Sequence, residues 1–145
     1  MTMTAYCRTL VAGFTVSMLA ACGALQPAPR QADGCAAGFE AFERDTLYFG
    51  RAIPTGGRVS EAEWLRFLDD TITPAFPKGL TVLDAAGQWR GASGDVVREP
   101  SKLVVLLHPR DPAADAAVAH VIDAYRKTFL QEAVLQERQS VCVRF

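Results

Sequence analysis

Apolar and polar residues recur in an order that predicts four strands and two helices in the folded part of the chain. Strands are expected at residues 46–50, 80–90, 101–108 and 141–145, with residue 96 as an alternative start of the third. The first helix is expected between Ser60 and the prolines Pro74 and Pro77, and the second between Asp111 and Phe129. This order is that of the ferredoxin-like βαββαβ fold, an α+β architecture in which two helices cover one face of a four-stranded antiparallel sheet.

Each predicted helix begins with a capping signal. Ser60 and Glu63 have the spacing of a capping box, and Asp111 is followed by a proline at the first helical position. Apolar residues then recur every three or four positions and predict the buried stripe of each helix. These residues are Trp64, Leu65, Leu68 and Ile72 in the first helix, and Val118, Val121, Ile122, Tyr125 and Phe129 in the second.

The second and third strands are expected to form one long hairpin that turns at residues 91–94. A single register then places Trp89 near Val97 and Val82 near Val104. A shorter second strand that ends in a tight turn at residues 84–87 is the alternative.

Residues 103–107 of the third strand, Leu-Val-Val-Leu-Leu, are apolar without alternation. A strand with one wet face alternates, so both faces of this strand are expected to be covered. The helices cover one face, and a second copy of the chain is our candidate for the other, as a homodimer. Cover by the N-terminal segment or by loops is the alternative.

The first 21 residues have the composition of an export signal. A polar start with Arg8 precedes about a dozen apolar residues, which is fewer than the roughly 20 that span a bilayer. The run ends in Leu19-Ala20-Ala21-Cys22, which resembles the lipobox at which bacterial lipoproteins are cleaved and lipidated. We therefore expect a signal peptide at 1–21, a lipidated N-terminus and tether at 22–44, and one domain at 45–145. An ordinary signal peptide with Cys22 unmodified is the alternative.

A lipid on Cys22 implies a protein that is anchored to a membrane of the cell envelope and faces the periplasm. Residue 23 is Gly, whereas an Asp at this position retains many lipoproteins in the inner membrane. The resemblance therefore implies the outer membrane.

The four cysteines have separate expected fates. Cys7 leaves with the leader and Cys22 takes the lipid, which leaves Cys35 and Cys142 to form a disulfide in an oxidising compartment. The ferredoxin-like order supports this pair because its last strand lies beside its first. Two free thiols are the alternative, and no metal site is expected because the two remaining cysteines and two histidines are widely scattered.

Charge and motifs exclude several function classes. The chain has 15 basic and 16 acidic residues, interspersed, so a nucleic-acid partner is not expected. It contains no P-loop and no nucleophile elbow, and we expect no cofactor.

One group of polar residues is a candidate for a small pocket on the long hairpin. Its members are Trp89, Arg90, Arg98, Glu99 and Ser101, and His108 at the end of the third strand is a candidate general base. The simpler interpretation is a cross-strand Arg–Glu pair beside a packed Trp, which contributes less than about 1 kcal/mol, together with a hydrogen-bonded histidine.

Several short motifs occur in order along residues 45–145. They are Leu47-Tyr48-Phe49-Gly50, Gly57-x-Val59-Ser60, Thr73-Pro74-x-Phe76-Pro77-x-Gly79-Leu80-Thr81, Gly87-Gln88-Trp89-Arg90, Glu99-x-Ser101-Lys102 and Phe129-x-Gln131-Glu132-x-Val134-Leu135. Together they resemble a family of uncharacterised bacterial lipoproteins of unknown function. The resemblance implies a lipoprotein and no known activity.

The leading hypothesis is therefore a non-enzymatic, lipid-anchored envelope domain that binds a partner protein or a small ligand. One alternative is a small enzyme of the dimeric α/β-barrel kind, monooxygenase- or isomerase-like, with His108, Arg90 or Glu99 in its cavity. The other is a purely structural envelope component. A cavity reached by those residues favours the enzyme, whereas an exposed apolar patch favours a binding partner.

Overall fold

The computed structural model describes residues 34–91 and 93–145. The predictions for residues 1–33, which include the leader and the lipidation of Cys22, lie outside the described residues. Residues 31–145 form one compact unit. The core and the disulfide both lie within this unit, so it contains the interactions that hold the fold together.

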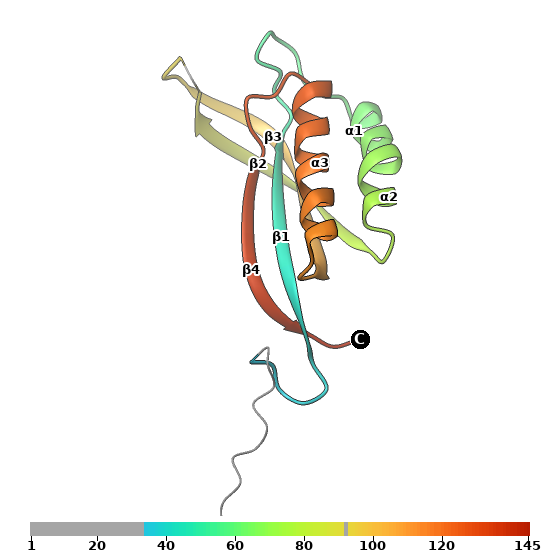
Figure 1. Ribbon diagram of the computed structural model, residues 1–145. Coiled ribbons are helices and arrows are strands. Elements are labelled where there is room, and N and C mark those ends of the chain that lie inside the picture. Colours follow the sequence, from blue (N-terminus) through green and yellow to red (C-terminus); the bar gives the residue numbers. More distant parts are fainter. Residues whose placement is uncertain (1–33, 92) are drawn as a thin grey trace, which may run out of the picture. The chain divides into compact units, whose positions relative to one another are not determined.

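The order of elements is that of the ferredoxin-like fold. The chain forms β1 (Glu40–Gly50), α1 (Glu61–Phe67), η1 (Leu68–Ile72), α2 (Thr73–Ala75), β2 (Leu80–Arg90), β3 (Val96–Pro109), α3 (Pro112–Thr128) and β4 (Leu135–Val143). The strands pair antiparallel in the order β2-β3-β1-β4. Both helical segments lie on one face of the sheet (Figure 1), which confirms the predicted fold class.

The core lies between the sheet and the helices. It combines inward residues of β1 and β3 with the apolar stripes of the helices, and aromatic rings fill its centre. Its members are Leu47, Phe49, Val59, Trp64, Phe67, Ile72, Phe76, Val104, Leu106, Val118, Val121, Tyr125 and Phe129. The predicted stripe of α3 is confirmed, with Ile122 only partly buried.

The first helical stretch differs from its prediction in two ways. The capping box of Ser60 and Glu63 is present, but Leu65 is exposed and Phe67 takes the buried position. Pro74 does not end the helix, which continues to Ala75. The π turn η1 precedes it, with the N–H of Thr73 bonded to the carbonyl of Leu68 five residues back. This wider turn shifts the hydrogen-bond register just before the proline, which has no N–H to donate.

The outer bounds of β1 and β4 were predicted wrongly. β1 begins at Glu40 rather than at residue 46, and β4 spans Leu135–Val143 rather than 141–145. Polar residues of the two strands face each other on the helix side here, as in the pair Asp45–Arg138. The apolar alternation that reveals a strand is therefore missing from these segments.

The hairpin of β2 and β3 is confirmed in its longer form. Trp89 pairs with Val97 and Val82 pairs with Val104, and the N–H of Gly91 donates to the carbonyl of Asp95 at the turn. β3 begins at Val96, the alternative start given above, and runs through Pro100 without interruption. β1 pairs with β3 only as far as Ser101, so the proline next to it interrupts no β1 hydrogen bond.

Cys35 and Cys142 are joined by a disulfide, with their Cα atoms 5.6 Å apart. Cys142 lies in β4 opposite Ala41, near the start of β1. The bond therefore attaches the segment before β1 to the neighbouring edge strand.

Candidate functional site

The residues predicted to line a pocket fall into separate groups: Trp89, Glu99 and Ser101 share one face of the hairpin, whereas Arg90, Arg98 and His108 do not lie on that face. Side chains alternate between the two faces of a strand, and Val82, Val104 and Leu106 face the core. Trp89, Glu99 and Ser101 occupy the alternate positions, so they lie on the sheet face away from the helices. Arg90 lies on the other side of β2 and donates to the carbonyl of Gly94 within the turn. His108 lies at the opposite end of β3 and faces the helices.

Glu99 forms a clasp at the far end of the hairpin. Its side chain is almost buried, and its carboxylate accepts hydrogen bonds from Trp89 Nε1 at 3.0 Å and from the backbone N–H of Ala52. Gly50 leaves the necessary space, because a Cβ there would lie 2.4 Å from Glu99 Oε1. Glu99 therefore ties the hairpin to the segment after β1, and it forms no ion pair with any described arginine.

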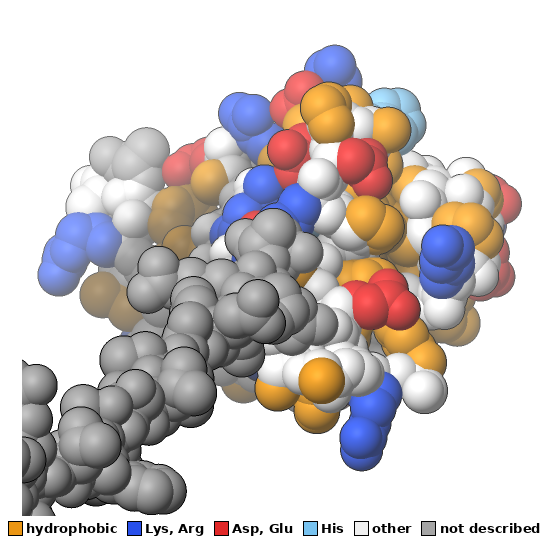
Figure 2. Space-filling model, turned by 60° about the horizontal axis from the view of Figure 1, so that its bottom comes forward, with side chains coloured by type: hydrophobic (Ala, Val, Ile, Leu, Met, Phe, Trp, Pro, Cys, Tyr) orange, Lys and Arg blue, Asp and Glu red, His pale blue; other side chains and the backbone are white. Residues whose placement is uncertain are grey.

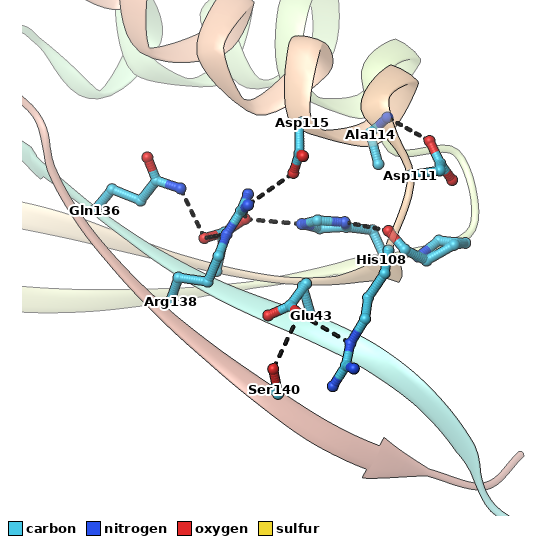
Figure 3. A network of polar contacts seen from close by, with 11 residues as sticks. Glu43, His108, Asp111, Ala114, Asp115, Gln136, Arg138 and Ser140 are labelled. Carbon is cyan, nitrogen blue, oxygen red and sulfur yellow. Dashed lines mark hydrogen bonds and ion pairs between the residues drawn. The ribbon is translucent and has the colours of Figure 1, made fainter. Parts of the chain in front are cut away.

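His108 belongs to a buried polar network on the helix side of the sheet (Figure 3). Its Nε2 lies 2.8 Å from Asp45 Oδ2, and its Nδ1 lies 2.9 Å from the backbone oxygen of Pro109. Both ring nitrogens therefore already lie within hydrogen-bond distance of an oxygen atom of the protein. Neither nitrogen is then free to take a proton from a substrate, so this arrangement gives no support to the general-base role considered for His108.

Asp45 is the centre of this network and is fully buried. Arg138 donates to both carboxylate oxygens, with Nη2 at 2.7 Å and Nε at 3.0 Å, and Gln136 Nε2 donates at 2.8 Å. The guanidinium also reaches Asp115 on α3 at 2.7 Å, from Nη1. The network thus connects β1, β3 and β4 with α3.

These contacts keep Asp45 ionised despite its burial. Burial alone raises the pKa of this carboxyl, but hydrogen bonds from Arg138, Gln136 and His108 outweigh it and lower the pKa to about 2. The carboxylates of Asp45 and Asp115 both pair with the guanidinium of Arg138, and pairing of this kind is the condition for charges to remain inside a protein. The arrangement is chemically suited to holding the sheet and α3 together.

The sequence did not reveal the other members of this network. Gln136 and Arg138 are 91 and 93 residues away from Asp45 in the chain. Residues 136–140 of β4 are polar at every position, so the sequence does not show which of them face inward. The strand had also been predicted to begin only at residue 141.

The sheet face away from the helices is the third candidate region, and we call it the open sheet face. Its apolar centre consists of Leu83 on β2 and of Leu103, Val105 and Leu107 on β3. Leu83 and Leu107 are 47% and 39% exposed, and no helix of the described residues covers them (Figure 1). Val104 and Leu106 point the other way and are fully buried, so the continuous apolar run serves two faces.

The described part of the chain contains no group of three or more residues able to hold a metal ion. Within the same residues, no helix combines the length and apolar character needed to cross a membrane.

Residues 44–145 match a protein family described as "Protein of unknown function (DUF3574)". The chain belongs to this family. The matched region contains β1 from residue 44 onward and every later element, so the buried network and the apolar centre of the open sheet face both lie within the DUF3574 region. No curated protein matches the chain.

Two solved structures of a phage SAM lyase, at low sequence identity, have the same fold. A phage SAM lyase in complex with S-methyl-5'-thioadenosine has a TM-score of 0.56 and 14% identity, over 72% of this chain and 90% of that chain. A phage SAM lyase in the apo state has a TM-score of 0.54 and 14% identity, over 77% of this chain and 94% of that chain. CutA from Synechococcus elongatus PCC7942, complexed with Bis-Tris, has a TM-score of 0.47 and 11% identity, over 71% and 83%. At this identity the likeness concerns the fold alone.

Proposed function

We propose that this DUF3574 protein is a lipid-anchored envelope protein whose domain binds a second copy of itself through the open sheet face. The observation that carries the proposal is the apolar centre of that face, which no described helix covers. Exposed apolar patches rimmed by polar residues are typical of protein interaction sites.

The shape and charge of the open sheet face suit a second copy. Four strands about 4.8 Å apart and about 30 Å long present roughly 600 Å² of flat surface, close to the ~800 Å² that each partner contributes to a standard interface. Arg44 on β1 and Glu137 on β4 lie on this same face. Because side chains of both signs lie on this face, Arg44 of one copy can meet Glu137 of the other about a two-fold axis.

The proposed anchor rests on Leu19-Ala20-Ala21-Cys22, and with it the proposed location on the periplasmic side of the outer membrane. The Cys35–Cys142 disulfide supports an oxidising compartment. Two or three acyl chains on one cysteine hold a protein stably on a membrane, whereas one chain does so only marginally.

Two leucines of equal exposure provide a matched test of the second copy. Leu83 on the open sheet face and Leu65 on α1 are each 47% exposed. We expect the purified protein in detergent to sediment as a dimer, Leu83→Asp as a monomer, and Leu65→Asp as a dimer. A monomeric wild-type protein at about 50 μM, where a micromolar complex is mostly associated, would overturn the homodimer.

The anchor is tested by the mass of the N-terminal peptide from protein extracted from membranes. We expect an acylated Cys22 as the first residue, loss of the lipid in Cys22→Ser, and no change in Cys7→Ser because Cys7 leaves with the leader. An unmodified Cys22 would remove the anchor and leave the homodimer proposal intact.

A further inference from the structure

A cavity of about 300 Å³ opens beside His108, between the loop after α2, the end of β3 and the first turns of α3. This is the end of the domain where β1 begins, because Phe42 of β1 pairs with Pro109 of β3. The volume lies at the lower end of the roughly 300–1,000 Å³ of small-molecule sites. The cavity is therefore large enough for a small organic compound.

The wall of the cavity is mainly apolar. Phe76 and Pro77 form one side, and Ala113, Ala114 and Ala117 of α3 form the other. The rings of Phe76 and His108 lie 6.1 Å apart between centroids. The three small side chains leave open the space that larger residues would fill, so an apolar body of a ligand would contact aromatic and methyl groups.

The polar side chains that line the cavity differ in whether they already have hydrogen-bond partners within the protein. The carboxylate of Asp111 accepts the N–H of Ala114 at 2.8 Å as the cap of α3, and both nitrogens of His108 already face oxygen acceptors. Lys78 also lines the cavity, is exposed, and forms no ion pair with another described residue. Figure 2 looks toward the end of the domain where β1 begins, and the coloured surface there shows apolar and charged side chains interspersed.

We infer that this cavity binds a small carboxylate with an apolar body. The apolar body packs against Phe76 and the alanines of α3, and the carboxylate lies toward the ammonium of Lys78. His108 contributes ring surface and is held in place by Asp45, so the site binds its ligand without acting on it. This inference rests on neither the lipid anchor nor the second copy, although Leu107 lines the cavity and also belongs to the open sheet face.

The direct test is NMR on uniformly ¹⁵N-labelled, oxidised protein of residues 31–145, the compact unit that contains the core and the disulfide. Phenylacetate is the probe, and phenethylamine is its counterpart with the same ring and the opposite charge. We expect phenylacetate to shift the amide signals of Phe76, Lys78, Gly79 and residues 113–117 with a Kd of about 1 mM or tighter. Phenethylamine is expected to bind several-fold more weakly because its ammonium meets Lys78.

Three variants locate the site. Ala117→Leu fills the cavity and should weaken phenylacetate binding at least about tenfold, since the space for the ring is lost. Ala119→Leu, on the exposed side of the same helix, should leave binding unchanged. Lys78→Gln should weaken phenylacetate by up to about fivefold, as expected for one exposed charge pair, and should leave phenethylamine no weaker.

The inference is overturned if about 10 mM phenylacetate shifts no signal, because that concentration would saturate a millimolar site. It is also overturned if the shifted signals lie elsewhere, or if Ala117→Leu binds as the wild type does. Thermal unfolding of each variant checks its fold. Should Ala117→Leu unfold, the exposed Lys78→Gln substitution decides, and equal affinity for phenylacetate in that variant overturns the site.

Discussion

Asp45 carries its charge in the interior of the domain, where an isolated carboxylate would be strongly disfavoured. Arg138 and Gln136 from β4 and His108 from β3 provide its hydrogen bonds. Removing one partner of such a buried group leaves the others desolvated and unpaired, which costs more than the pair itself contributes. The network is therefore a sensitive point for stability rather than a large source of it.

We predict that Asp45→Asn destabilises the domain by about 3–5 kcal/mol at neutral pH, because Arg138 loses the carboxylate that it pairs with in the interior. The folded-state pKa of Asp45 is lowered to about 2 from 3.8, so its contribution is fully present above about pH 4. That contribution is lost as the pH falls from about 4 toward 2, and the difference between wild type and variant should shrink over this range.

Urea unfolding at pH 7, 4 and 2.5 measures this difference. Asp123→Asn is the control, since Asp123 is an exposed residue in an i,i+3 pair with Arg126 on α3. It should change stability by less than about 1 kcal/mol at each pH. An Asp45→Asn difference that stays constant down to pH 2.5 would contradict the lowered pKa.

The network around Asp45 shows which features of a buried site local sequence patterns can predict and which they cannot. His108 was found as a strand-end histidine, but its partner could not be, because Asp45 is 63 residues away in the chain. A charged residue at an inward strand position looks the same in sequence as one that faces water. Only the pairing of β1 with β3 and β4 distinguishes the two.

The hairpin of β2 and β3 is the element on which sequence reasoning succeeded most fully. Its register was predicted because two apolar pairs, Trp89–Val97 and Val82–Val104, require the same alignment. The role of Glu99 was not predicted, because its partners Ala52 and Gly50 belong to another part of the chain. The same limit applied to β4, whose polar residues give no apolar period.

We predict that Gly50→Ala destabilises the domain by about 1–3 kcal/mol, since the new Cβ displaces the Glu99 carboxylate and leaves Trp89 Nε1 and the N–H of Ala52 without an acceptor. The test is a double-mutant cycle with Glu99→Ala. In that background the clasp is already absent, and Gly50→Ala should cost clearly less. Equal costs in the two backgrounds would mean that Gly50 does not act through Glu99.

At the scale of the whole molecule, topology brings the two ends of the described chain together. β4 lies beside β1 at the sheet edge, and the Cys35–Cys142 disulfide joins the segment before β1 to that edge. The sequence predicted this arrangement because the ferredoxin-like order and the cysteine pair imply each other. The open sheet face was predicted in the same way, from one strand that is apolar on both sides.

The disulfide should stabilise the domain mainly by restricting its unfolded state. It joins cysteines 107 residues apart, and a loop of that length corresponds to about 4–5 kcal/mol in the chain-entropy model, with smaller values common in practice. Cys35 is buried, but the apolar cluster between the sheet and the helices includes neither cysteine, so the reduced protein should remain folded. We therefore predict that reduction lowers the free energy of unfolding by about 2–5 kcal/mol while the far-UV circular dichroism spectrum is retained.

Urea unfolding with and without dithiothreitol measures this loss, and the variant Cys35→Ala/Cys142→Ala separates the disulfide from other effects of the reductant. The variant should have the stability of the reduced protein and should not respond to dithiothreitol. The phenylacetate site and the open sheet face depend on the sheet and helices, so both should persist in the variant. Loss of the folded spectrum on reduction would show that the bond is required for the fold rather than added to it.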